Sequence, residues 1–150
     1  MTDTNFRVLN NIPATQLYDG LAVAGLNGLA MRSANVTLSA ASPVLAFRLN
    51  PGDVILSATA VVNTAVSLGV ASVISVGMAP TSTGAVGDQL LVSTSNTTQN
   101  SNVALGAGTK PAPYIVQGTA PFLVVSVPTA GTVTSGSVIV SVLVSNQRNA

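Results

Sequence analysis

The sequence predicts an all-β protein, a β-sandwich or jelly roll of about eight short antiparallel strands with an extended N-terminal arm. Short runs rich in Val, Ile, Leu and Thr recur along the chain between clusters of Gly, Pro, Asn and Ser, which is typical of strands joined by turns. The 3.6-residue apolar period of a helix is missing, so no helix longer than about three turns is expected. The 150 residues fit a single domain. We place the arm at residues 1–32 and the sandwich domain at residues 33–150.

The expected strands follow one another from residue 35 onward, each bounded by turn-forming residues. The turn at 50–53, with Pro and Gly at its centre, precedes the longest of the early strands. Residues 93–111 are rich in Ser, Asn, Thr and Gly and are interpreted as a long polar loop. The eight expected strands are 35–38, 44–49, 53–63, 70–76, 89–93, 114–117, 121–127 and 137–145.

Two of these segments alternate with the period of two that characterises a strand with one buried face. In the strand at 137–145, four valines alternate with serines. In the strand at 53–63, one face is expected to hold Val54, Leu56, Ala58, Ala60 and Val62. The valines of the last strand are Val138, Val140, Val142 and Val144.

The second faces of the same two strands are less polar than expected for a sheet exposed to water. Ile55, Val61, Ile139 and Leu143 lie there among Ser and Thr, whereas a monomeric sandwich normally places charged side chains on its outward face. Apolar side chains on an outward face indicate contacts between subunits. The alternative is a larger core in which loops cover both faces. We favour subunit contacts and expect a homo-oligomer, most simply a trimer.

The composition argues against several functional classes. Only 6% of the residues are charged, compared with about 25% in ordinary soluble domains, so there is little charge repulsion between molecules. Without His or Cys, the usual proton-transfer and thiolate sites cannot form, and we expect neither an enzyme nor a cofactor or metal site. Asp53 and Asp88 each follow a Gly, and ordinary turn chemistry accounts for them better than a catalytic carboxylate pair.

Nucleic-acid and membrane partners are not expected either. The five basic residues are scattered, whereas nucleic acids require clustered Lys and Arg. Residues 54–87 contain no charge, but Gly and Pro interrupt the run and its residues are mostly β-branched or hydroxylated. This pattern differs from that of a membrane-spanning helix.

The arm differs from the rest of the chain because its apolar side chains are spaced irregularly between Asn, Gly and Pro. Such a segment cannot form its own core, but it can be ordered by adding to a sheet edge of a partner, with side chains in pockets. The alternative is that it folds back on its own domain. The candidate partner-binding residues are Phe6, Arg7, Leu9, Ile12, Leu17 and Tyr18.

Several segments together resemble small virion proteins of tailed bacteriophages. They are residues 51–56 leading into a strand, 75–77 before a Gly-Asp loop, and 119–127 followed by a Pro-Thr-Ala-Gly turn and a closing strand. The resemblance covers about residues 43–145. It implies a jelly-roll-like decoration (cement) protein or head-fibre base on the outer surface of the capsid, often trimeric, with the major capsid protein as partner. The alternatives are a receptor-binding or adhesin module of a fibre or pilus, and a small carbohydrate-binding sandwich. The last is disfavoured because the chain has few aromatic residues.

Overall fold

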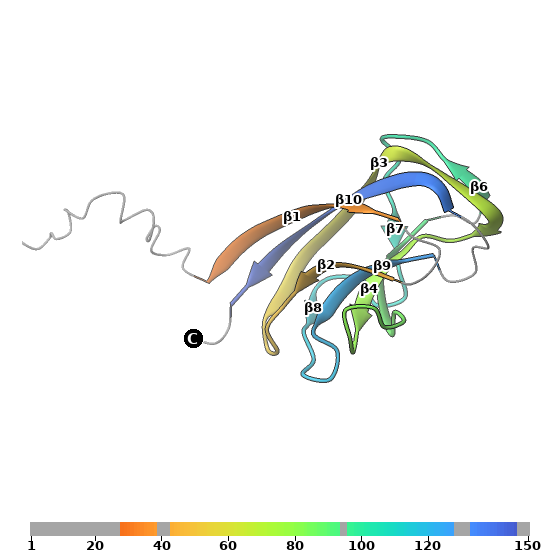
Figure 1. Cartoon of the computed structure of the whole chain (residues 1–150). Coiled ribbons are helices and arrows are strands. Elements are labelled where there is room, and N and C mark those ends of the chain that lie inside the picture. The colour runs from red at the N-terminus through yellow and green to blue at the C-terminus, as the bar shows by residue number, and fades with distance from the viewer. Residues whose placement is uncertain (1–27, 39–42, 94–95, 128–132, 147–150) are drawn as a thin grey trace, which may run out of the picture.

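The computed structural model describes residues 28–38, 43–93, 96–127 and 133–146, which form ten strands and no helix. Two antiparallel sheets are built from them (Figure 1), so the predicted all-β sandwich is confirmed, with ten described strands in place of about eight. The strands are β1 (Leu29–Thr37), β2 (Val44–Arg48), β3 (Val54–Ser72), β4 (Ser75–Ala79), β5 (Asp88–Val92), β6 (Asn96–Gln99), β7 (Gly106–Ala107), β8 (Tyr114–Ile115), β9 (Phe122–Ser126) and β10 (Val133–Ser145).

Each sheet contains five strands. Sheet 1 has the order β1-β10-β3-β6, and β8 pairs with the beginning of β3 beside it. Sheet 2 has the order β2-β9-β4-β5-β7. In Figure 1 the long strands β1, β10 and β3 run side by side in one layer, and β2, β9 and β4 lie in the other. Because β1 and β10 are the first and last described strands, the two ends of the sandwich domain meet within sheet 1.

The core lies between the sheets and is built almost entirely of aliphatic side chains. The predicted alternation of β10 is confirmed, because Val138, Val140, Val142 and Val144 are all buried. Ile74, which lies between β3 and β4, is also fully buried in this core. Burying a side chain of this size contributes about 1.5–3 kcal/mol, so the core supplies the main stabilisation of the fold. Further core residues are Ile55, Val62, Val66, Val76, Met78, Leu90, Leu123 and Val125.

The strand predicted at 53–63 is longer than expected and its first residues face the other way. β3 continues to Ser72, and the break falls between Ser72 and Ser75, so the predicted strand at 70–76 is divided between β3 and β4. Ile55 is fully buried and Leu56 is exposed, which is the reverse of the prediction. The reason is a β-bulge beside Leu143, where the register shifts by one residue and the bulged strand changes face.

The polar segment predicted as a loop at 93–111 contains two strands and closes one edge of the sandwich. β6 pairs with β3, and β7 pairs with β5, so the segment joins the two sheets. The backbone N–H of Leu105 donates to the carbonyl of Ala60 at 2.9 Å, and that of Gly108 donates to Leu90 at 2.8 Å. The loop prediction was wrong because the segment shows no alternation of apolar side chains that would indicate a strand. Its strands pair through backbone N–H and C=O groups, which do not depend on such a pattern.

The other edge of the sandwich lies between β1 and β2. The Arg32 guanidinium lies 5.0 Å from the centre of the Phe47 ring, and its Nη1 donates to the carbonyl oxygen of Arg48 at 3.1 Å. β1 begins at Leu29, so the last four residues of the segment predicted as the arm belong to a strand of sheet 1. The arm prediction for residues 1–27 lies outside the described residues.

Candidate subunit interface

The outer face of sheet 1 is the side of β1, β10 and β3 that points away from the core. Because side chains alternate along a strand, cross-strand neighbours on this face form four successive rows. About 20 Å separates the first row from the last along β1, at roughly 3.3 Å per residue. The rows are Leu29, Ser145, Val54 and Ile115; then Met31, Leu143 and Ser57; then Ser33, Ser141 and Thr59; then Asn35, Ile139 and Val61.

Large apolar side chains are concentrated on this face. Met31 is 69% exposed and Ile115 is 58% exposed, and Leu29, Leu56 and Ile139 are also exposed. The bulge in β3 adds Leu56 beside Ser57, because two residues of the bulged strand oppose one residue of its partner. Among the described residues, five of the seven exposed large hydrophobic side chains lie here. Apolar side chains gathered on one exposed face in this way make it a candidate interaction surface.

Between its apolar ends the face carries a row of hydroxyl groups. The Oγ atoms of Ser33 and Ser141 are 2.8 Å apart and form a hydrogen bond across β1 and β10, and Thr59 continues the row on β3. Neutral hydroxyls can both donate and accept. The face therefore has an apolar end, a hydroxyl row, and a fourth row that holds apolar Ile139 and Val61.

None of the five charged side chains in the described residues lies on this face. Arg32 points to the opposite side of β1 and stacks on Phe47, and Arg48 lies 5.6 Å from the centre of the Phe122 ring on sheet 2. Asp53 is buried in the turn before β3. Asp88 and Lys110 form an ion pair with 3.2 Å between Oδ1 and Nζ. The outer face of sheet 1 is therefore neutral.

A second polar feature ties the β7–β8 connection to β5. The Tyr114 hydroxyl donates to Asp88 Oδ2 at 2.6 Å, and Lys110 contacts Oδ1 of the same carboxylate. The hydrogen bonds from Tyr114 and Lys110 lower the pKa of Asp88. Burial, followed by the hydrogen bond to Asp88, raises the pKa of Tyr114 to about 12. These contacts hold the β7–β8 connection against β5. At neutral pH Asp88 remains ionised and Tyr114 remains protonated, as both residues ordinarily are.

Asp53 and Asp88, weighed above as a carboxylate pair, both have structural roles in their own turns. The N–H of Asp53 donates to the carbonyl of Asn50 at 3.0 Å, which closes the turn at 50–53. Asp88 begins β5 and accepts the two bonds just described. No group of three His, Cys, Asp or Glu side chains that could hold a metal occurs in the described ranges. The same part of the chain contains no helix that is long and apolar enough to cross a membrane.

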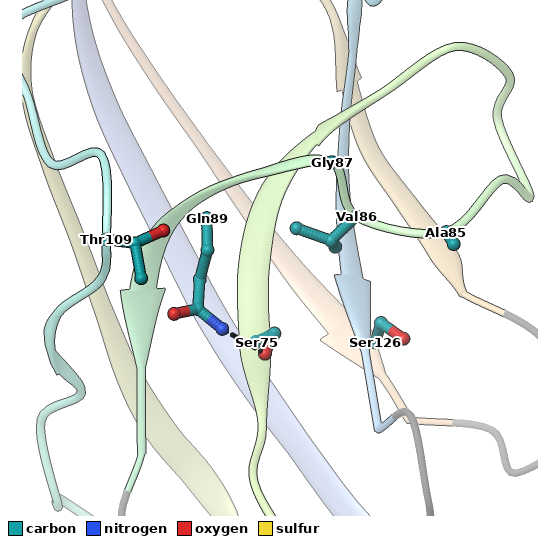
Figure 2. A pocket seen from close by; sticks show the side chains of 7 residues that line it. All are labelled: Ser75, Ala85, Val86, Gly87, Gln89, Thr109 and Ser126. Carbon is teal, nitrogen blue, oxygen red and sulfur yellow. Dashed lines mark hydrogen bonds between the residues drawn. The ribbon is translucent and has the colours of Figure 1, made fainter.

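The outer face of sheet 2 has a shallow depression of about 290 Å³. Figure 2 shows Gln89 and Thr109 on one side of it, Ala85 and Val86 on the other, and Ser75 between them. The Gln89 Nε2 donates to the Ser75 Oγ at 2.8 Å. The depression is lined by Ser75, Ala85, Val86, Gly87, Gln89, Thr109 and Ser126. Its polar groups are uncharged hydroxyls and an amide, which fit a neutral, hydrogen-bonding ligand.

The sequence located part of the candidate interface. Val61, Ile139 and Leu143 lie on the outer face of sheet 1 as predicted, whereas the placement of Ile55 on that face was wrong because of the bulge. The sequence reasoning missed Met31, because the arm prediction extended over it. Leu29, Leu56 and Ile115 were missed as well; the alternation of Leu29, Met31 and Ser33 was a usable signal. The predicted partner-binding residues Phe6, Arg7, Leu9, Ile12, Leu17 and Tyr18 all lie outside the described residues.

The fold and this face together define a β-sandwich with one neutral, partly apolar sheet surface, which is a candidate site for packing against other protein subunits. Among solved structures, the chain is similar to one chain of the "Cyanophage Pam1 capsid asymmetric unit", with a TM-score of 0.50 and 17% sequence identity. The match covers 79% of this chain and 86% of that chain, so the two chains share the sandwich fold and have similar lengths. No protein-family model and no curated protein matches the sequence.

Proposed function

We propose that this chain is a structural, non-catalytic protein of a bacteriophage virion. The observation that carries the proposal is the shared fold, over most of both chains, with a chain of a cyanophage capsid asymmetric unit. The low charge content and the neutral outer face of sheet 1 support the proposal. A protein that is bound to other subunits in an assembly does not need charge repulsion to keep its molecules apart.

Within the virion, the role that these features favour is that of a decoration or cement protein on the outer surface of the capsid. Such a protein binds the major capsid protein at joints between coat subunits and stabilises the shell by linking neighbours. A compact sandwich with contact surfaces beyond its own core suits this task, because one surface can bind the shell while another binds further copies. We propose a homotrimer, because several linked copies bind a repeating lattice with higher avidity than one copy alone.

The arm is the proposed contact with the shell. Its candidate residues Phe6, Leu9, Ile12 and Tyr18 supply large side chains for pockets, while the main chain adds to a sheet edge of the partner. Ordering an extended segment costs roughly 1–2 kcal/mol per residue. The contact must therefore be long, and binding by several joined copies offsets part of the cost. Arg7 and Leu17 complete the proposed contact.

The test is binding of the purified protein to phage shells that lack it, measured by co-sedimentation. The truncation should remove residues 2–27, because a deletion to residue 32 would remove the first four residues of β1. We expect the intact chain to bind at saturating, lattice-defined stoichiometry, and the truncated chain to keep its β-type circular dichroism but lose binding. Absence of binding by the intact chain contradicts the cement role. Equal binding by both chains shows that the sandwich itself contacts the shell.

A receptor-binding or adhesin module is the second candidate, and the depression on sheet 2 is the observation that favours it. Ser75, Gln89 and Thr109 present neutral hydrogen-bonding groups at its surface, which suit a polar ligand on a cell surface. Binding of labelled protein to host cells distinguishes the two roles. A receptor-binding module binds cells through this depression and loses binding when Gln89 is changed to Ala, whereas a cement protein binds shells and does not bind cells.

A further inference from the structure

The outer face of sheet 1 is unusual because it is neutral and apolar although it is exposed. Exposed antiparallel sheets normally carry charged side chains that keep the molecule soluble and block unwanted pairing. Here the described residues place every charge elsewhere, and Met31, Ile115 and Leu56 project from the face instead. Such a face is suited to being covered in the working molecule.

We propose that copies of this chain meet on the outer face of sheet 1, around a rotation axis that runs along the strands. The inference rests on the proposed homo-oligomeric virion protein and specifies which surface joins the copies. β10 is the middle strand of the face, between β1 and β3, so Ile139 and Ser141 lie nearest the axis. In this arrangement, the outer face of sheet 1 of one copy is covered by the same face of a neighbouring copy.

The order of the rows supports a like-with-like contact. Rotation about an axis parallel to the strands keeps every row at its own height, so each row meets the same row of the neighbouring copy. The apolar row with Met31 and Leu143 then packs on itself. The hydroxyl row with Ser33 and Ser141 also meets hydroxyls, which can donate and accept in turn.

The absence of charge supports the same arrangement. At a rotation axis, any charged side chain faces the identical charge of its neighbours, and like charges brought together in an interface strongly oppose association. A neutral face avoids this penalty. A different protein partner imposes no such condition, because opposite charges on the two partners are then an advantage. The placement of Arg32 on the other side of β1, stacked on Phe47, keeps its charge off the face.

The first experiment is site-directed cross-linking of the full-length protein. The natural chain has no Cys, so one introduced Cys can form only intermolecular links. We expect Ser141→Cys to give covalently linked copies in the presence of a short bismaleimide. The control Leu45→Cys, at an exposed position of sheet 2, should stay unlinked under the same conditions. Linking at Leu45 without linking at Ser141 overturns the proposal.

The second experiment places a charge on the face. We expect Met31→Asp to raise the dissociation constant of the oligomer at least about tenfold, because the new carboxylate is buried in the interface and meets no opposite charge on the neutral face of the neighbouring copy. Leu45→Asp is the matched control and should leave the dissociation constant unchanged. Both positions are exposed, and circular dichroism checks that both variants fold. Sedimentation equilibrium supplies the measurement, and an oligomer of unchanged stability in Met31→Asp overturns the proposal.

Other occupants of the face give different outcomes, each of which overturns the proposal. If residues 1–27 cover it, the intact chain is monomeric and becomes oligomeric on their removal. If the coat protein covers it, Ser141→Cys links to coat protein and only in the presence of shells. Shell binding is measured in parallel: an oligomer that forms through this face without binding shells refutes the proposed function and leaves the present inference intact.

Discussion

Substitution of Gly77 by Ala tests the close packing of sheet 2 most directly. Gly77 lies in β4, between β9 and β5. A Cβ at this position would lie 2.6 Å from Val86 Cγ1 and 2.9 Å from the Cα of Gln89, and closer still to the carbonyl oxygen of Asp88. Two of these three atoms belong to the backbone of β5, so a side-chain rotation cannot relieve the clash.

The expected cost follows from these contacts. Overpacking a tight site costs typically about 1–3 kcal/mol, and the backbone contacts place Gly77→Ala near the upper end. Replacing Gly by Ala also restricts the unfolded chain, which stabilises the folded state by about 0.4–1 kcal/mol. The expected net loss is therefore about 2 kcal/mol, a large share of a domain stability of about 5–15 kcal/mol. With a urea m-value of about 2 kcal/mol/M, the unfolding midpoint should fall by about 1 M.

Gly87→Ala is the matched control. The nearest atom to its added Cβ is the carbonyl oxygen of Met78 at 3.7 Å, an ordinary contact distance, and the effect on the unfolded chain is the same as for Gly77. Without a clash to offset that effect, we expect Gly87→Ala to be more stable than the natural protein by about 0.4–1 kcal/mol. Urea unfolding followed by circular dichroism measures both variants. Equal midpoints for the two variants refute the close approach of β4 and β5 at Gly77.

Four further predictions concern the core and the Tyr114 contact. Leu123→Ala should lower the free energy of unfolding by about 2–5 kcal/mol because Leu123 is fully buried, whereas Leu45→Ala should lower it by less than about 1 kcal/mol; chemical denaturation checks both. Tyr114→Phe removes the bond to Asp88 and should cost about 1 kcal/mol at neutral pH. Because the folded pKa of Tyr114 is raised from 10.0 to about 12, the natural protein should lose stability as the pH rises through that interval, and Tyr114→Phe should not show this loss. The pKa of Asp88 is lowered in the folded state, so its ionised carboxylate stabilises the fold above about pH 4. This stabilisation should be lost as the pH falls further, and thermal unfolding at a series of pH values measures the loss.

The parts of the fold that sequence analysis could predict are those in which side-chain pattern and backbone pairing agree. The valines of β10 alternate without interruption and all face the core. In β3 the bulge at Leu56 shifts the alternation by one residue, and a strict period of two cannot show where an extra residue is inserted. β6 and β7 were missed because their pairing uses the backbone of β3 and β5, while the side chains of β6 are polar and β7 consists only of Gly106 and Ala107.

The candidate interface was only partly predictable for a similar reason. Ile139 and Leu143 stand out in the sequence because they interrupt a row of serines. Leu29 and Met31 do not stand out, since the chain before them contains irregular apolar residues that hide the start of the strand. Ile115 lies in a two-residue strand between prolines and Gly, too short for any period, and only its pairing with Val54 brings it to the face.

The pairing of β1 with β10 has a consequence for when the protein becomes competent to assemble. Ser33 and Ser141 are bonded across the two strands although 108 positions separate them in the chain. Contacts between such distant residues form late, because a long loop must close before they contribute. During synthesis, Met31 leaves the ribosome long before Leu143, so a nascent chain cannot present the two side by side. A surface built from both ends of the domain thus exists only on a finished subunit, and the proposed oligomer excludes chains that stop short of β10.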